Sequence, residues 1–372
     1  MRLFSDACSG VDDPYFSRAL TLAEQARGAT APNPLVGCVI VSDGAVVGEG
    51  FHAQAGGPHA EGVALRQAGE RARGAHAFVT LEPCAHFGKT PPCAEALVDA
   101  GVAKVTIGMA DPSAEAAGGA KRLREAGVAV EFASESAPFE ELNAGWLRRA
   151  RTGRPLVTAK VGLSLDGHPA LEEGRRSAMT GPDGARVTQR LRAAADAVLV
   201  SASTVAIDDP ALTLRDASGV LASRQPLRVV LVREQLPPLD ARVFTDSAAE
   251  TLVLSMREDG SPCDLGRGVT VHACGGGALD DALLALGERG ISELLVEPGP
   301  RLLTALVEEE LIDRLVMVEA GGFAGTDAPA LYLGGAQRVD AALSPAFTPV
   351  EAGIVGDVSV IVWRPCRRAG LR

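Results

Sequence analysis

Predicted helices and strands alternate along this chain in two successive runs, and this alternation constrains its fold more than any other feature. In the first run, Asp12-Asp13-Pro14 predicts a helix start, because acidic residues cap a helix and Pro suits its first turn. Ser42-Asp43-Gly44 predicts a hairpin turn. Strands separated by single helices require crossover connections, so the run predicts a largely parallel sheet. Its predicted strands are Val36–Val41, Val46–Phe51, Ala77–Leu81, Lys104–Met109 and Val128–Phe132, and its further helices are a segment from His59 to Gly74, Ala94–Ala100 and Lys121–Ala126.

A second run of the same kind follows a short basic segment. Residues 149–155 (RARTGRP) contain Gly and Pro and have no apolar period, which is typical of a linker. We therefore expect two α/β domains, residues 1–148 and residues 156–372. The strands predicted in the second domain are Leu156–Val161, Ala197–Ser201, Leu227–Val232, Thr251–Ser255, Glu293–Glu297, Arg314–Val318 and Asp357–Trp363, and its helices are Gly184–Ala195, Leu279–Glu288 and Arg301–Glu309.

The net charge argues against a nucleic-acid-binding protein. The 372 residues include 36 Lys and Arg against 47 Asp and Glu, a formal charge of −11, whereas such proteins neutralise phosphates with Lys and Arg. No apolar stretch approaches the roughly 18–20 residues of a membrane span, and the N-terminus lacks the pattern of a secretory signal. We therefore expect a cytoplasmic protein. Seven Cys are too sparse for a disulfide scaffold in so long a chain, which favours metal binding or burial.

Three short strings predict a zinc site: His59-Ala60-Glu61, Glu82-Pro83-Cys84 and Cys93. One imidazole and two thiolates leave a position on zinc open for water, as in catalytic sites. The order H-x-E, then P-C and a second Cys, is the zinc-deaminase signature, in which the Glu transfers protons. Zinc lowers the pKa of bound water to about 7, and the carboxylate helps the amine to leave. Each residue alone fits a simpler role, as a buried Cys or a helix cap, but the ordered set favours catalytic zinc.

Eight residues, Ala85 to Pro92, separate the two cysteines, where the usual deaminase string has two. Gly88 and the Pro pair suit the turn that brings both sulfurs to one metal. The loop also carries His86 and Lys89, and a cation there suits a substrate phosphate. The residues alone leave open whether Lys89 binds phosphate or is a solvated loop residue.

These segments resemble the bifunctional riboflavin-biosynthesis deaminase/reductase family. The resemblance lies in residues 31–41 (APNPLVGCVIV), 48–52 (GEGFH), 59–61 (HAE), 80–93 (TLEPCAHFGKTPPC), 160–167 (KVGLSLDG), 203–215 (STVAIDDPALTLR) and 297–300 (EPGP). It implies an N-terminal cytidine-deaminase-like α/β/α sandwich with one Zn²⁺ and a C-terminal dihydrofolate-reductase-like α/β domain that uses NADPH. The first domain would deaminate 2,5-diamino-6-ribosylamino-4(3H)-pyrimidinone 5′-phosphate. The second would reduce the ribosyl chain to give 5-amino-6-ribitylamino-uracil 5′-phosphate.

The same resemblance implies roles for individual residues. In the deaminase, Glu61 would be catalytic, and the substrate contacts would be Asn33, His52, His86 and Lys89. The NADPH site would comprise Gly162, Thr204, Asp208, Gly299, Pro300, Arg301, Leu302, Leu303, Thr304 and Ala305. The reductase substrate would contact Lys160, Asp166, Arg192, Leu212, Arg215 and Glu297. Two of these, Arg192 and Arg215, have the chemistry of phosphate clamps, although a surface Arg needs no such role.

Two positions depart from the family pattern. Ser113 stands where the family has Asn, which puts a ribose or phosphate contact there in question. Ala178 stands where the family has Trp, while Arg175 and Arg176 add charge beside it. This departure leaves open an active deaminase with a non-catalytic second domain. Weaker alternatives are a polynucleotide-directed deaminase and a zinc-stapled module without catalysis. Exposed sheet edges in both domains favour a homodimer.

Overall fold

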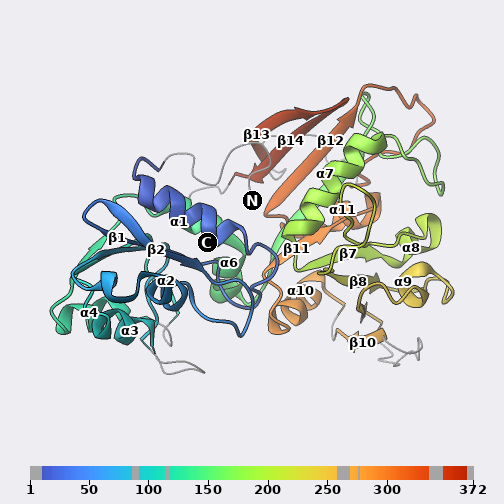
Figure 1. Ribbon diagram of the computed structural model, residues 1–372. Helices are drawn as coiled ribbons and strands as arrows, with labels where there is room; N and C mark the ends of the chain where they lie inside the picture. Colours follow the sequence, from blue (N-terminus) through green and yellow to red (C-terminus); the bar gives the residue numbers. More distant parts are fainter. Residues whose placement is uncertain are drawn as a thin grey trace. The chain divides into compact units, whose positions relative to one another are not determined.

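The computed structural model describes residues 11–85, 92–113, 117–257, 269–274, 277–334 and 347–366. The chain divides into two compact units, Met1–Thr152 and Gly153–Arg372 (Figure 1). The division falls within the segment predicted as a linker, residues 149–155. Helix α6 (Ala144–Thr152) occupies the first four residues of that segment. Among the described residues, no helix has the length and apolar character to cross a membrane.

The first unit is built on a five-stranded mixed sheet of order β2-β1-β3-β4-β5. Its strands are β1 (Gly37–Ser42), β2 (Ala45–Phe51), β3 (His76–Val79), β4 (Lys104–Ile107) and β5 (Ala129–Phe132). The expectation of a largely parallel sheet is confirmed for β3, β4 and β5, which are parallel to one another, while β1 is antiparallel to both of its neighbours. The predicted hairpin explains the difference. Asp43 and Gly44 both have positive φ, 50° and 77°, as the tight turn of such a hairpin requires.

Helices cover both faces of this sheet, as the α/β/α sandwich predicts. On one face, side chains of β1 such as Ile40 pack against α2 (Ala60–Ala68), α3 (Cys93–Asp99) and α4 (Gly119–Glu125). On the other face, Val39 and Phe78 pack against α1 (Pro14–Glu24), α5 (Ala137–Leu142) and α6. The predicted cap at the first helix is present, since the Asp13 carboxylate accepts hydrogen bonds from the N–H groups of Tyr15 and Phe16. A short 3₁₀ helix, η1 (Gly69–Ala72), follows α2.

The second unit is built on a nine-stranded sheet of order β10-β9-β8-β7-β11-β6-β12-β14-β13. From β10 to β12 all neighbouring strands are parallel, and β14 is antiparallel to both β12 and β13. The strands are β6 (Leu156–Leu163), β7 (Ala197–Ser201), β8 (Leu227–Val232), β9 (Thr251–Ser255), β10 (Val269–Ala273), β11 (Glu293–Val296), β12 (Arg314–Ala320), β13 (Phe347–Val355) and β14 (Val358–Pro365).

The core of the second unit lies on the faces of this sheet. Side chains of β6, β7, β8 and β9 form one apolar cluster with α10 (Leu279–Glu288) and α11 (Pro300–Glu308). Helix α7 (Gly181–Ala194) buries Val187 and Leu191 and lies against β11 (Figure 1). Two short helices, α8 (Ala202–Asp208) and α9 (Arg242–Thr245), follow β7 and β8. Because helices alternate with parallel strands, the carboxyl ends of β6, β7 and β11 meet at one edge, where α/β sheets bind ligands.

Several elements were not predicted from the sequence, namely α5, α6, α8, α9, β10 and β13. The largest is β13, whose sequence FTPVEAGIV contains a Pro and lacks strict alternation. The strand tolerates Pro349 because it lies at the sheet edge and its register shifts between Pro349 and Glu351, and edges and bulges are where strands accept Pro.

Candidate functional site

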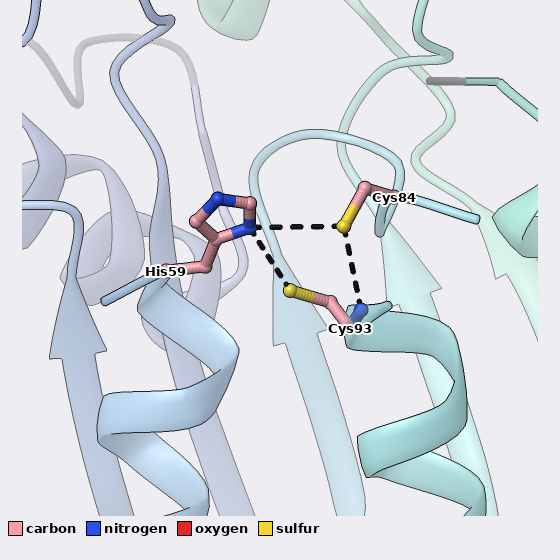
Figure 2. A group of neighbouring side chains, drawn as sticks. All are labelled: His59, Cys84 and Cys93. Atoms are coloured by element: carbon pink, nitrogen blue, oxygen red, sulfur yellow. Dashed lines mark hydrogen bonds between the residues drawn. The ribbon is translucent and has the colours of Figure 1, made fainter. Parts of the chain in front are cut away.

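The three predicted zinc ligands come from three separate elements of the first unit. His59 is the residue before α2, Cys84 follows β3, and Cys93 is the first residue of α3 (Figure 2). His59 and Cys93 lie where the chain leads into a helix, and Cys84 lies in the loop after β3. The N–H of Cys93, at a helix start, donates to Sγ of Cys84 over 3.3 Å. Such N–H groups stabilise a thiolate.

The distances between the ligand atoms fit a single zinc ion. Nδ1 of His59 lies 3.2 Å from Sγ of Cys93 and 3.7 Å from Sγ of Cys84, and all three ligand atoms lie within 4.8 Å of one another. Tetrahedral zinc with ordinary bond lengths separates a nitrogen and a sulfur ligand by about 3.6 Å. Figure 2 shows the imidazole and both sulfurs directed toward one point. Among the described residues, His59, Cys84 and Cys93 could therefore hold a metal ion through three ligand atoms.

The electrostatics of the site favour a cation. Hydrogen bonds from the Cys93 side chain and from His59 lower the pKa of the Cys84 thiol to about 4, despite its partial burial. That sulfur is a thiolate at neutral pH, which is the form that binds zinc. The hydrogen bond with Cys84 in turn raises the pKa of His59. The negative charge of the group therefore lies on the Cys84 sulfur, while the hydrogen bond with Cys84 and burial raise the pKa of the Cys93 thiol.

Glu61 is the second residue of α2 and lies two positions after His59. Its side chain is buried, at 3% relative exposure. Burial raises the pKa of its carboxyl, and the nearby Cys84 sulfur adds to the rise. The carboxylate also lies within hydrogen-bonding reach of the Cys93 side chain. A carboxyl with a raised pKa beside a metal site can both accept and return a proton near neutral pH.

Asn33 and His52 form a hydrogen-bonded pair next to the metal ligands. Nδ2 of Asn33 lies 3.1 Å from Nε2 of His52, and Nδ1 of His52 lies 3.0 Å from the carbonyl oxygen of Pro58. The ring of His52 meets that of His59 edge-on, with 5.6 Å between the centroids. Burial lowers the pKa of His52, so its imidazole is neutral. His86 and Lys89 lie outside the described residues.

Two buried polar residues that the sequence analysis did not single out organise this site. The Glu82 carboxylate accepts hydrogen bonds from the N–H groups of Asp111, Gly118 and Ala120, which ties the start of α4 to the strand end that carries Cys84. Asn143 binds the backbone of Leu35. The position of Glu82 beside Pro83-Cys84 could have indicated its role from the sequence, whereas no sequence signal indicates a role for Asn143.

Ser113, which stands where the family has Asn, donates its N–H to the Asp111 carboxylate over 2.8 Å.

In the second unit, the predicted residues gather at the carboxyl ends of β6, β7 and β11. Gly162 adjoins Lys160 on β6, since a methyl group at Gly162 would lie 3.8 Å from Nζ of Lys160. Thr204, after β7, lies near Gly299, after β11, because a methyl group at Gly299 would lie 3.8 Å from Oγ1 of Thr204. Strand β11 pairs with both β6 and β7. The structure therefore brings Lys160, Gly162, Thr204 and Gly299 to one edge.

Lys160, Arg192 and Glu297 form a charged group within this edge. Arg192 donates to both oxygens of Glu297, over 2.7 and 3.0 Å. Burial tends to raise the pKa of Glu297, but Arg192 and Lys160 outweigh it and the pKa is lowered. Burial lowers the pKa of Lys160, which Glu297 partly opposes. Arg192 and Lys160 therefore favour the anionic form of Glu297.

The predicted cofactor turn leads into α11, whose cap residue is Gly299. Leu302, Leu303 and Thr304 are buried, and Oγ1 of Thr304 accepts a hydrogen bond from the N–H of Leu333. The side chains of these three residues therefore serve the fold. What this turn offers a ligand is its free N–H groups at the helix start, the usual place for a pyrophosphate.

The remaining reductase residues are engaged with the protein itself. The Asp166 carboxylate accepts hydrogen bonds from the N–H groups of Ala324 and Gly325, both over 2.9 Å. Nη1 of Arg215 donates to the carbonyl of Gly219. Leu212 is buried with a φ of 51°. Burial raises the pKa of Asp208, and the positive charge of Arg176 partly opposes this rise. Arg176 and Ala178 are exposed in the described structure.

Comparisons with known proteins cover both units. Residues 10–109 match the family model of the cytidine and deoxycytidylate deaminase zinc-binding region, and residues 155–351 match that of the RibD C-terminal domain. The riboflavin biosynthesis protein RibD of Escherichia coli is 43% identical over 86% of this chain and 90% of its own length. That of Aquifex aeolicus is 40% identical over 82% and 86%.

Solved structures of similar proteins superpose on both units. RibD from Acinetobacter baumannii has a TM-score of 0.86 at 36% identity and covers 95% of this chain and 98% of its own. A diaminohydroxyphosphoribosylaminopyrimidine deaminase/5-amino-6-(5-phosphoribosylamino)uracil reductase from Thermotoga maritima has a TM-score of 0.84 at 31% identity, with the same coverage.

Proposed function

Because this chain belongs to the RibD family of bifunctional riboflavin-biosynthesis enzymes, we propose that His59, Cys84 and Cys93 hold the zinc of its deaminase and that Glu61 transfers the protons. The enzyme deaminates 2,5-diamino-6-ribosylamino-4(3H)-pyrimidinone 5′-phosphate and reduces the ribosyl chain of the product with NADPH. The observation that carries the residue assignment is the approach of three ligand atoms to within 4.8 Å of one another, with the buried Glu61 carboxyl beside them.

In the deaminase, this chain contributes Glu61, which transfers protons during the reaction. Bound zinc supplies a Lewis acid that lowers the pKa of a water ligand to about 7. Glu61 accepts a proton as the water oxygen bonds to the ring carbon that bears the amine. The same carboxyl delivers that proton to the ring nitrogen. It then accepts the second proton from the new hydroxyl group on the ring carbon and delivers it to the amine, so that the carbon–nitrogen bond breaks, the carbonyl forms and ammonia leaves. The raised pKa of Glu61 suits both transfers.

His52 orients Asn33 in this proposal. A neutral His52 that donates Nδ1–H to the Pro58 carbonyl must accept at Nε2, so the Asn33 atom facing it is the amide nitrogen. The Asn33 oxygen is thereby left for an N–H group of the pyrimidine. His86 and Lys89 are assigned to the sugar and phosphate of the same substrate by resemblance to the family.

In the second unit, Lys160 and Glu297 hold the ribosyl chain, and Arg192 fixes Glu297. NADPH supplies the hydride when it is bound. Gly162, Thr204, Asp208 and the turn of residues 299–305 bind the cofactor, with the pyrophosphate at the start of α11. Asp166, Leu212 and Arg215 border the substrate, and Arg215 has the geometry to bind phosphate if its hydrogen bond to Gly219 opens.

A homodimer is also part of this proposal. Strand β13 ends the nine-stranded sheet, and it exposes Val350 and Ile354, at 50% and 78%. An apolar sheet edge of this kind favours pairing with a second copy. Sedimentation at micromolar concentration tests this, and a monomer at all concentrations would contradict it. The cytoplasmic location expected from the sequence stays a prediction.

One assay of the purified protein tests both activities together. Ammonia release from the diaminopyrimidine phosphate and NADPH oxidation with the deaminated compound are measured with and without a zinc chelator. We expect the chelator to stop ammonia release and to leave NADPH oxidation unchanged. Ammonia release that survives complete zinc removal contradicts the zinc assignment, and absent NADPH oxidation contradicts the assignment of the reductase residues.

A further inference from the structure

Asn143 is a buried polar residue that no step of the proposed function uses. It lies between α5 and α6 and has 2% relative exposure. Its Oδ1 accepts a hydrogen bond from the N–H of Leu35 over 2.8 Å, and its Nδ2 donates to the carbonyl oxygen of Leu35 over 3.0 Å. One side chain therefore binds both backbone groups of one residue more than a hundred positions away.

The backbone that Asn143 binds leads directly to Asn33. The N–H of Asn33 donates to the carbonyl of Thr30 over 2.7 Å, which closes a turn. Pairing with the rest of the sheet begins at Val36, whose carbonyl accepts from the N–H of His52. Leu35 lies between the turn and the sheet, and it is buried at 7%. Asn143 thus supplies to Leu35 the two hydrogen bonds that a neighbouring strand would otherwise supply.

We propose that Asn143 is a positioning residue for pyrimidine recognition, because it fixes the backbone two residues beyond Asn33. The inference rests on the proposed role of Asn33 as a substrate contact. Two restraints then converge on Asn33. His52 sets the direction of its amide, and Asn143 sets the place of its backbone. A binding group held this way loses little freedom when substrate binds, which strengthens binding.

The chemistry of this contact demands an amide. Asn and Gln offer an acceptor and a donor side by side without any change of protonation, as the N–H and carbonyl of one residue require. Asp at this position keeps the acceptor but places a second oxygen against the Leu35 carbonyl. Ala removes both partners and leaves two buried backbone groups unpaired, which costs more than the hydrogen bonds themselves contribute.

The first test compares Asn143→Ala and Asn143→Asp in the full-length, zinc-loaded enzyme. We expect the deaminase KM to rise about threefold to tenfold, the equivalent of one or two lost hydrogen bonds, with kcat, zinc content and the reductase KM unchanged. Arg27→Ala is the matched control, because Arg27 donates to the carbonyl of Leu142, the residue adjacent to Asn143. An unchanged deaminase KM in both Asn143 variants overturns the proposal, as does a loss of zinc. If the Ala variant does not fold, the Asp variant alone decides.

A second test asks whether Asn143 acts through Asn33. If it does, Asn33→Ala combined with Asn143→Ala has the same deaminase KM as Asn33→Ala alone, whereas independent effects multiply and would overturn the proposal. If Asn33→Ala by itself leaves the KM unchanged, the proposed role of Asn33 has failed. Amide hydrogen exchange then tests the anchor separately. Faster exchange at Leu35 in Asn143→Ala, with Val39 unchanged, supports it, and unchanged exchange at Leu35 refutes it.

Discussion

The guanidinium of Arg192 binds the carboxylate of Glu297 through two parallel hydrogen bonds, from Nε to Oε1 over 2.7 Å and from Nη2 to Oε2 over 3.0 Å. Nη1 of Arg192 donates to the carbonyl of Thr213 over 3.0 Å. All three nitrogens of this guanidinium are therefore engaged with the protein. From the sequence, Arg192 was a candidate phosphate clamp. In the structure its planar fork fixes the carboxylate that faces Lys160.

Arg192→Lys is predicted to impair the reductase selectively. Lys cannot make the parallel pair of bonds, so the Glu297 carboxylate loses its fixed orientation. Misplacement of this kind costs up to about 10²-fold in rate, and we expect a loss of that order in the kcat/KM of NADPH oxidation with unchanged ammonia release. Arg190→Lys is the control, since Arg190 is exposed on the same helix. A variant with wild-type reductase kinetics would show that Glu297 needs no such support.

Glu61→Gln is predicted to retain zinc and lose deamination. Gln fills the same space but cannot accept the proton, so ammonia release should fall by about 10²–10⁴-fold. Zinc content measured by atomic absorption, and NADPH oxidation with deaminated substrate, should both match the wild type. Deamination at more than about a tenth of the wild-type rate would mean that another group carries the proton.

Cys93→Ser is predicted to lose the metal together with the deaminase activity. Serine is a poor zinc ligand at neutral pH, and the two remaining ligands are too few for a stable site. Zinc should fall from about one per chain, and ammonia release should fall with it. Cys366→Ser is the control, because Cys366 is exposed and lies in the other unit. Full zinc content in Cys93→Ser would exclude Cys93 from the ligand set.

The proximity of His59, Cys84 and Cys93, which could hold a metal ion, could be predicted from sequence because each residue belongs to a short local string. His59 and Cys93 lie at helix starts, where local signals fix the backbone, and Cys84 follows the Glu82-Pro83 string. The hydrogen bonds of Asn143 and Glu82 could not be predicted in this way. Both side chains bind backbone groups that only tertiary folding brings near, and the Asn143 contact spans 108 positions. The partner of Arg192 is likewise set by the packing of α7 against β11.

The strands show the same contrast. The three strands β7, β8 and β9 match their predicted bounds, because they are buried and almost wholly apolar. Strand β13 went unpredicted because its Pro349 and polar residues contradict local strand signals. Its pairing with β14 overrides them. Sequence patterns thus identify central strands, whereas an edge strand depends on its neighbour.

Lys160→Met is predicted to stabilise the second unit at neutral pH. Burial lowers the pKa of Lys160, so the ammonium is less favourable in the folded than in the unfolded chain. As pH rises past the lowered pKa, the folded state releases its proton before the unfolded state does, and wild-type stability increases. The advantage of the variant should therefore shrink from pH 7 toward pH 10. Urea unfolding, followed by Trp363 fluorescence in a Trp146→Phe background, measures this.

The control for this measurement is Lys121→Met, because Lys121 is exposed on α4 in the first unit. Lys121→Met should leave the unfolding free energy reported by Trp363 unchanged at both pH 7 and pH 10. A Lys160→Met variant that is less stable than the wild type at pH 7 would show that attraction to Glu297 outweighs the cost of burial.

Gly119→Ala is predicted to destabilise the first unit and weaken its zinc site. A methyl group at Gly119 would lie 1.7 Å from the carbonyl oxygen of Pro83, the residue before the zinc ligand Cys84. Helix α4 must then move away, which pulls the N–H groups of Gly118 and Ala120 from the Glu82 carboxylate. Overpacking of this kind costs about 1–3 kcal/mol. Gly62→Ala is a control of opposite sign, since nothing lies within 4 Å of a methyl group there, and Ala in an open helical position stabilises by about 0.5–1 kcal/mol. Thermal unfolding and zinc affinity are measured on both variants. Together they separate a local effect on the Cys84 segment from a general loss of helix stability. Equal zinc affinities would show that the contact between Gly119 and Pro83 does not position Cys84.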